Sequence, residues 1–422
     1  MKVRFRQILW LLLLVIFSDA LSAQNNTNSP YTRYGYGALA DPISSNSRAM
    51  GGMGIGLRDR LHVNISNPAS YTAMDSLTFL FDGGVTLQNT NFSDGTYKLN
   101  AKNTSMNYFA MLFRLNKKAA MSLGLTPFSF VGYNLRQTYD DATSADNYSS
   151  LNFYGDGGLH QLYGGIAINF IKNLSIGANF SYIWGDITHR AVQAFPRNPS
   201  ALGVTNVENV DVRSFKFDFG MQYVHRINSR NTLVIGAVYT PKQKLSNDAS
   251  LTTSLGVSGA YTEVATVTDT IVTCEIPNSY GLGFSYVYDQ RWTVGMDVLY
   301  QQWSKVKFMN GKDLFCDRMK VSVGAEYMPA LYGNNFLKLV KYRAGAYYSL
   351  PYYKLDGKRA AREYGVSLGF GLPVPRSNCI INISGQYAHL QGIGASRLDE
   401  NILQVTVGLT FNETWFFKRR IN

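Results

Sequence analysis

Hydrophobic and polar residues alternate along most of the chain, from residue 77 to residue 411. In the clearest segment, Leu174 to Gly185, one face is apolar and aromatic and the other is mainly small or polar. This period of two is typical of β-strands whose faces meet different surroundings. At Phe215–Tyr223 the second face carries Lys216 and Asp218, which are costly to bury in a soluble sandwich but can face the wet lumen of a membrane barrel.

About fourteen segments have this pattern, an even number within the range of bacterial barrels. They lie near residues 77–89, 103–115, 119–134, 162–170, 174–185, 215–223, 232–240, 280–288, 292–300, 319–327, 340–349, 364–372, 381–387 and 403–411. The links between them alternate in length. Short turns are expected near 116–118, 171–173, 227–231, 289–291 and 373–378, and long loops near 136–158, 189–211, 241–277 and 350–362. Periplasmic turns and extracellular loops produce this alternation, so the sequence predicts an all-β, antiparallel transmembrane β-barrel of about 14 strands over 77–411.

A large secreted β-sandwich or propeller is the alternative fold. Such a fold would not favour aromatic residues at strand ends, where interfacial girdles of a membrane barrel place them. Aromatic residues do recur at the predicted strand ends, at Tyr182, Trp184, Trp292, Tyr300 and Trp303. Charged residues make up only 16% of the chain, against a usual quarter. Both observations favour the barrel.

The first 23 residues have the pattern of a secretory signal peptide. Three cations, Lys2, Arg4 and Arg6, precede an apolar run from Ile8 to Phe17. The run is about half the roughly 20 residues that a membrane helix needs, so it predicts cleavage rather than anchoring. Cleavage is expected after Ala23, with Ala20 as the other candidate. The chain is therefore expected in the outer membrane of a Gram-negative cell.

Residues 24–76 differ from the rest of the mature chain. They are rich in Gly, Asn and Ser and show no sustained alternation. Their glycine cluster lacks the preceding strand and the spacing of a dinucleotide-binding fingerprint. Non-helical backbone at membrane depth has to be buried in protein or line a cavity. The segment is therefore expected to fold into the barrel lumen as a plug.

The remaining chemistry is sparse. The formal charge is +12. Export argues against a nucleic-acid partner. The positive charge could instead attract outer-membrane lipid headgroups or an acidic ligand, or simply form a solvated basic rim. The five histidines are scattered without zinc-ligand spacing, so no metal, cofactor or catalytic residue is expected. Cys274 and Cys316 are expected in extracellular loops, accessible to labelling, and Cys379 near the periplasmic end of a strand; whether the first two pair is open.

Two segments resemble the long-chain fatty-acid transporter family, whose best-known member is FadL, and its Bacteroidetes-type relatives. The first combines an Arg-Ala pair, a glycine-rich turn and an Asn-Pro-Ala motif before the first strand, at Arg48, Ala49, Gly51, Gly52, Gly54, Gly56, Asn67, Pro68 and Ala69. The second is Pro277–Tyr286, followed by Trp292–Asp297 and Trp303. The resemblance implies a barrel with a luminal plug built on the first set. The stretch Leu57–His62 departs from the family, so ligand identity does not carry over.

Passive uptake of a hydrophobic, fatty-acid-like small molecule is the function that this resemblance implies. The alternative is an accessory subunit of an outer-membrane protein secretion or assembly complex. Residues 412–422 are expected to form a periplasmic tail, and its cations Lys418, Arg419 and Arg420 would contact such a partner or simply be solvated.

Overall fold

The computed structural model describes residues 27–76, 78–140, 148–198, 200–257, 260–269, 272–309, 311–333, 335–375, 377–394 and 396–414. The predicted signal peptide lies outside this range, as does most of the predicted C-terminal tail.

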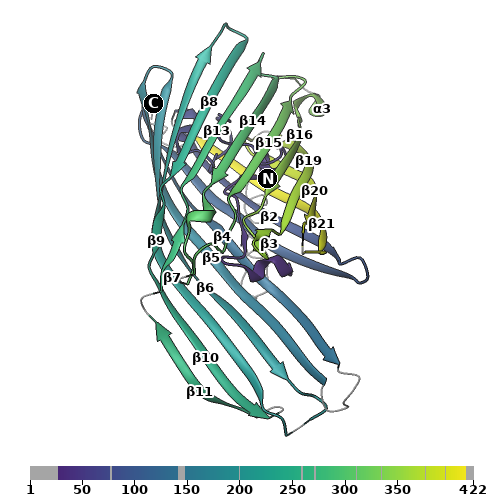
Figure 1. Ribbon diagram of the computed structural model, residues 1–422. Helices are drawn as coiled ribbons and strands as arrows, with labels where there is room; N and C mark the ends of the chain where they lie inside the picture. Colours follow the sequence, from purple (N-terminus) through teal and green to yellow (C-terminus); the bar gives the residue numbers. More distant parts are fainter. Residues whose placement is uncertain are drawn as a thin grey trace, which may run out of the picture.

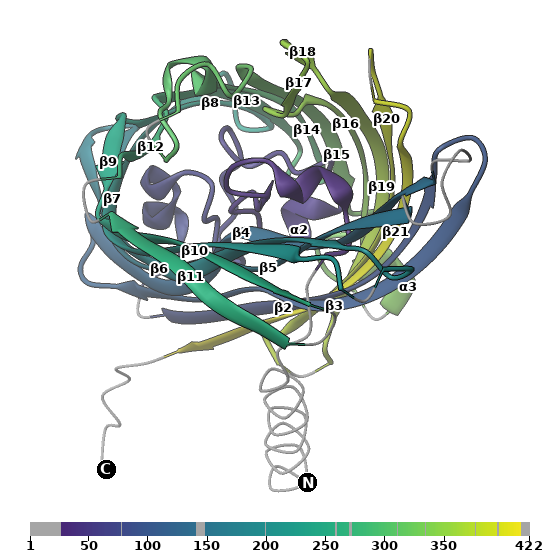
Figure 2. The same ribbon diagram turned by 60° about the horizontal axis from the view of Figure 1, so that its bottom comes forward.

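Within these residues, fourteen antiparallel strands form a closed barrel (Figure 2). Each strand pairs with the next along the wall, and the last pairs with the first, from Thr78↔Thr414 to Ser93↔Asp399. The strands are β2 (Thr78–Ser93), β3 (Lys98–Arg114), β4 (Ala119–Asp140), β5 (Tyr148–Ile171), β6 (Leu174–Ala194), β7 (Gly203–Arg226), β8 (Asn231–Thr240), β13 (Ser279–Tyr288), β14 (Trp292–Gln301), β15 (Arg318–Tyr327), β16 (Lys341–Leu350), β19 (Ala361–Pro373), β20 (Ile380–Gly392) and β21 (Asp399–Thr414). The predicted fold class and the number of strands are confirmed.

The outer face of the barrel is apolar. On β7, Phe215, Phe217 and Phe219 expose between 42% and 52% of their surface. Large hydrophobic side chains are exposed in the same way on the other wall strands, which in water would be unfavourable over so wide an area. This band and the polar lumen are those of an outer-membrane barrel, and they place the protein in the outer membrane. In the described residues, no helix has the length and apolar character needed to span a membrane.

Three of the four long loops are not as predicted, because wall strands extend into the first two and further strands form within the third. β4, β5, β6 and β7 run far beyond the barrel, and β10 (Asn247–Val257) and β11 (Ala260–Asp269) extend their sheet from the edge of β7 (Figure 1). Their sequences are rich in β-branched residues, as in Val204–Val212, and each strand finds a continuous backbone partner. Glycines with positive φ at 157, 158 and 185 lie where these strands leave the barrel.

The barrel therefore has two unlike ends. At one end, which we call the short-turn end, brief links join β3 to β4, β5 to β6, β7 to β8, β13 to β14 and β19 to β20. Only the β15–β16 link there is longer, and it contains α3 (Phe336–Leu339). The opposite, long-strand end carries the sheet extension and three elaborate links. These contain β9 (Gln243–Leu245) paired with β12 (Cys274–Ile276), η3 (Trp303–Lys305), and β17 (Lys354–Leu355) paired with β18 (Lys358–Arg359).

Residues 27–76 lie inside the barrel (Figure 2), and we call them the luminal segment. Their regular structure is limited to η1 (Pro30–Arg33), β1 (Ala38–Leu39), α2 (Ser45–Arg48) and η2 (Pro68–Ala73). Met50, Met53 and Val63 are almost fully buried against the wall. The apolar groups of this irregular backbone are thus removed from water, which is the reason for expecting it in the lumen.

Candidate functional site

The luminal segment lies directly against glycines of the barrel wall. A Cβ atom added to Gly56 would stand 2.6 Å from the backbone nitrogen of Phe284, and one added to Gly51 would stand 2.6 Å from the carbonyl oxygen of Ala346. Gly51 also has a positive φ of 68°. Any side chain at these positions would push the segment away from the wall, which is why glycine is needed there. On the wall, glycines of seven strands meet the segment in the same way: Gly177, Gly220, Gly236, Gly283, Gly324, Gly345 and Gly369.

The carboxylate of Asp297 holds the glycine turn. It accepts hydrogen bonds from the backbone amides of Gly54 at 2.5 Å, Ile55 at 2.6 Å and Gly56 at 3.2 Å. Three successive amides pointing at one carboxylate form an anion-binding concavity of the kind that consecutive backbone N–H groups make. Sequence reasoning selected the glycines and missed Asp297, whose only signal was an acidic residue on the inward face of a strand.

Asn67 fixes the second motif. Its side-chain nitrogen donates to the carbonyl oxygens of Ile55 at 2.9 Å and Met221 at 3.2 Å, while its side-chain oxygen accepts from the amide of Ala69 at 3.1 Å. It therefore caps η2 and ties the segment to β7. Pro68 and Ala69 then pass against Gly177, where a side chain would collide with their backbone.

Arg48 and Ala49 lie at the end of α2. Ala49 packs on Gly369, and Arg48 reaches Gln404 at 3.4 Å. Burial lowers the pKa of the Arg48 guanidinium. All nine residues selected from the sequence thus lie in the luminal segment, spread along its path over several wall strands rather than gathered at one point.

Asp41 ties the segment to the barrel wall through two ion pairs. Its two carboxylate oxygens lie 2.7 Å from Arg318 and 2.7 Å from Lys320, both on β15. Burial opposes ionisation of Asp41, but the two cations outweigh that effect and hold the pKa of its carboxyl below the ordinary value. Separations of 277 and 279 residues kept this cluster out of reach of sequence reasoning.

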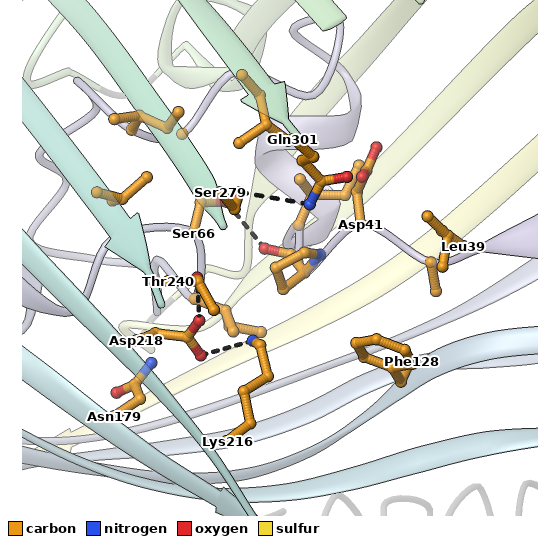
Figure 3. Close-up of a pocket in the computed structure, with 18 of the residues that line it drawn as sticks. Leu39, Asp41, Ser66, Phe128, Asn179, Lys216, Asp218, Thr240, Ser279 and Gln301 are labelled. Atoms are coloured by element: carbon orange, nitrogen blue, oxygen red, sulfur yellow. Dashed lines mark hydrogen bonds and ion pairs between the residues drawn. The ribbon is translucent and has the colours of Figure 1, made fainter. Parts of the chain in front are cut away.

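Two adjoining cavities, of about 160 Å³ and 240 Å³, lie between the luminal segment and the wall. Both are lined by Leu39, Asp41 and Ile43. Figure 3 shows the first cavity, with Leu39 and Phe128 on one side and Lys216 and Asp218 on the other. Lys216 pairs with Asp218 at 2.7 Å, and Thr240 donates to the same carboxylate at 2.6 Å. One side of the space is therefore apolar, and the polar side has its charges mutually compensated.

The second cavity reaches a gap in the barrel wall between β3 and β4. These strands pair only between Phe109–Arg114 and Ala120–Leu125. Beyond that point β3 stays paired with β2, and β4 stays paired with β5 as far as Asp140. Pro127, which has no N–H to donate, lies on β4 just where the two strands separate. We call this gap the β3–β4 seam.

β1 of the luminal segment occupies the edge of β4 that β3 leaves. Ala38 pairs with Phe130, and Leu39 pairs with Ser129. The other edge of β4 is taken by β5 at the same positions, so β1 lies on the side facing β3. The cavity lining includes Ser105 from β3 and Phe130 from β4, on the two sides of the seam.

An aromatic cluster lies at the long-strand end of the lumen. Tyr36, Trp303, Phe308, Phe315 and Tyr352 pack together, with ring centroids from 4.6 to 6.2 Å apart. The elaborate links between strands supply four of these rings, and the luminal segment supplies the fifth. Polar groups of the cluster form hydrogen bonds with the luminal segment; for example, the Tyr352 hydroxyl donates to the carbonyl oxygen of Gly37 at 2.6 Å.

The cysteines lie in the predicted connections, but one expectation about them is wrong. Cys274 and Cys316 are in links at the long-strand end, and Cys379 is in the β19–β20 turn. All three are free thiols, so Cys274 and Cys316 do not pair. Cys274 is fully buried beneath the aromatic cluster and cannot react from solution as expected. Among the described residues, no group of His, Cys, Asp and Glu is arranged to hold a metal ion.

Solved structures named as transporters or channels have the same fold. The chain is similar to the Ralstonia pickettii toluene transporter TbuX (15% identity, TM-score 0.59, covering 88% of this chain and 98% of that one). It is also similar to the Pseudomonas putida toluene transporter TodX (16%, 0.57, 90% and 100%) and to a Pseudomonas aeruginosa FadL homologue (15%, 0.54, 90% and 100%). The predicted FadL-like fold is confirmed. No curated protein matches the chain.

A family-level match covers nearly the whole sequence. The profile of the family described as BamG aligns with residues 5–422, from within the predicted signal peptide to the last residue. The match therefore includes the luminal segment, the barrel and the sheet extension together. On this evidence, the chain is a member of the BamG family.

Proposed function

We propose that the protein is a passive, non-enzymatic channel for hydrophobic small molecules, and that the β3–β4 seam is their lateral way out of the lumen. The seam is the observation that carries the proposal. A continuous wall would force an apolar solute to cross the whole lumen into water. A gap at membrane depth lets it pass from the lumen straight into lipid, where its apolar surface stays out of water.

The depth of the seam supports this role. Met106 lies in the part of β3 that is not paired with β4. It pairs with Val85 of β2, which in turn pairs with Val407 of β21. Met106 and Val407 expose their side chains on the lipid-facing side. The seam therefore begins within the apolar band rather than above it.

The luminal segment is proposed to act as a plug. Fourteen strands leave a lumen too wide for wall side chains alone to fill, and residues 24–76 would occupy it. Within the plug, β1 would be the movable part, since only two residues of it pair with the wall. The proposed domain scheme is a cleaved signal peptide at 1–23, the plug, the barrel and a periplasmic tail. The barrel was expected over 77–411 and the tail over 412–422, but β21 extends the wall to Thr414, so the tail would begin after that residue.

The entrance is proposed to lie at the long-strand end, facing the exterior. Short turns face the periplasm in bacterial barrels and longer connections face outward. The aromatic cluster lies at this end, where its rings are buried against one another, and Trp303 and Tyr352 line the two cavities that a solute would then reach. Similar structures are named as toluene transporters, and another is described as a monoaromatic hydrocarbon channel. These names agree with a small hydrophobic solute.

The test is uptake by whole cells. Cells lacking the gene and cells complemented with it would be given radiolabelled toluene, a radiolabelled long-chain fatty acid and, as a polar reference, a radiolabelled disaccharide. The proposal predicts faster uptake of at least one hydrophobic compound on complementation, with uptake of the disaccharide unchanged. Equal uptake of all three with and without the gene, together with stable recovery of secretion or assembly subunits on the solubilised protein, would favour the accessory-subunit alternative.

A further inference from the structure

We propose that the short-turn rim of the barrel carries a binding site for the phosphate group of an anionic membrane lipid. The site is a cavity of about 480 Å³ between the luminal segment and the ends of β5, β6 and β7. Four cations line it, Arg58, Lys118, Lys172 and Arg226, and its lining contains no carboxylate. This cavity shares no lining residue with the two cavities near the seam.

The four cations come from four separate parts of the fold. Arg58 belongs to the luminal segment, Lys118 to the β3–β4 turn, Lys172 to the β5–β6 turn, and Arg226 to the end of β7. Backbone hydrogen bonds tie the two turns and β7 together, and the Arg58 side chain bonds to Gln222 of β7. The amide of Asn169 donates to the carbonyl oxygen of Lys118 at 2.7 Å, and the amide of Val224 donates to that of Asn173 at 2.8 Å. The cavity is therefore held in shape before any ligand arrives, which lowers the entropic cost of binding.

The positive charge of this site is not compensated by the protein. The Arg58 guanidinium donates only to neutral oxygens, at 2.9 Å to Thr72, 3.1 Å to Gln222 and 3.5 Å to Ala69. In the part of the chain that the structure describes, none of the four lining cations makes an ion pair. Burial, and then the neighbouring Arg114, lowers the pKa of Arg58 to about 10. A bound anion would favour the charged form of Arg58 and so raise its pKa again.

The apolar residues beside the cations favour a lipid as the source of the anion. Phe170 and Ile171 line the same cavity and expose 63% and 58% of their surface. Phe170 lies on the outward face of β5, in line with the exposed Ile166 and Ile168. An acyl chain can follow this face while its phosphate enters the cavity, where Arg58 and Arg226 can each offer a planar pair of donors. Cations at the edge of an apolar band are well placed to bind headgroups.

The test measures binding to the full-length protein in a neutral detergent. Three probes would be titrated: short-chain phosphatidylglycerol, diacylglycerol with the same chains, and inorganic phosphate. The key variant is Lys172→Gln with Arg226→Gln, whose exposed side chains can be changed without disturbing packing, and Arg58→Gln is examined separately. The matched control is Lys312→Gln with Lys358→Gln, two exposed lysines in links at the long-strand end. Heat-dependent gel mobility checks that every variant is folded.

We expect phosphatidylglycerol to bind in preference to diacylglycerol. Its affinity should be at least about tenfold lower in the Lys172/Arg226 variant, since the loss of even one charge-assisted contact weakens binding by about that factor. The control variant should bind as the wild type does. If inorganic phosphate binds as tightly as phosphatidylglycerol, and the Lys172/Arg226 variant loses affinity for both, the anion site would be retained but assigned to a soluble ligand. Equal binding of phosphatidylglycerol by the wild type and by both folded key variants would overturn the proposal.

Discussion

Asp297 on β14 accepts a 2.5 Å hydrogen bond from the backbone amide of Gly54, and this contact joins the luminal segment to the barrel wall. Two further amides share the same carboxylate. Asp297→Asn removes the negative charge and turns half of the acceptor into a donor, which faces amides that also donate. The buried donors would then lack partners, at a cost of about 1–3 kcal/mol. We expect larger and noisier conductance in planar bilayers, while Asp248→Asn on the exposed sheet extension should leave the conductance unchanged.

Gly56→Ala tests the close approach between the luminal segment and the wall. The added methyl would lie 2.6 Å from the backbone nitrogen of Phe284, so the segment would have to move. We expect a loss of about 1–3 kcal/mol in the free energy of unfolding, the usual cost of overpacking. Gly385→Ala is the matched control, because a Cβ there meets nothing within 4 Å. Equal stability of both variants would show that the segment does not lie against the wall as described.

The Asp41 cluster predicts a pH dependence. The pKa of Asp41 in the folded protein lies below its unfolded value of about 3.9. Its pairing with Arg318 and Lys320 therefore contributes stability that is fully present above about pH 4 and is lost as the pH falls further. Other carboxylates titrate in the same range, so the quantity to measure is the difference in unfolding free energy between the wild type and Asp41→Asn. That difference should shrink between pH 6 and acidic pH; a constant difference would contradict the pairing.

Thiol labelling should distinguish the three cysteines. Cys274 and Cys379 are buried, and burial raises the pKa of the Cys274 thiol, whereas Cys316 is partly exposed. A maleimide reagent should therefore modify Cys316 first in the folded protein and reach the other two only after denaturation. Rapid labelling of Cys274 in folded protein would mean that the aromatic cluster opens readily.

The barrel could be predicted from the sequence because each wall strand has to present an apolar face to lipid. The alternation of apolar and polar residues from Phe215 to Tyr223 is an example of this requirement. The same alternation located all fourteen strands. The sheet extension lies beyond the barrel wall, and its strands do not keep this pattern. Segments such as Val204–Val212 are then distinguished from loops only by backbone pairing with distant partners, which the sequence does not display.

The candidate site was only partly predictable for a related reason. Glycines and an Asn-Pro pair are local signals of unusual backbone, and they identified the luminal segment. The groups that hold it, Asp297 and the pair Arg318 and Lys320, lie far away in sequence and resemble ordinary lumen-facing residues. At the β3–β4 seam, two regular strands are not hydrogen-bonded to each other, and no local sequence pattern by itself reports such an absence. Pro127 was its one local sign, and prolines are also common at edge strands and bulges where no gap opens.

The most direct test of lateral exit is a reversible staple that fixes β1 in place at the seam. Leu39 and Ser129 lie opposite each other in an antiparallel pair, at a spacing that suits a disulfide. Leu39→Cys with Ser129→Cys, in a Cys316→Ser background, would lock β1 against β4. Thr205→Cys with Ser254→Cys, which are directly opposite in the sheet extension, gives a control staple away from the seam. Uptake of the hydrophobic solute should fall severalfold in the oxidised seam variant, recover on reduction, and stay unchanged in the control. Undiminished uptake with the seam staple fully formed would contradict lateral exit that depends on movement of β1 at the seam.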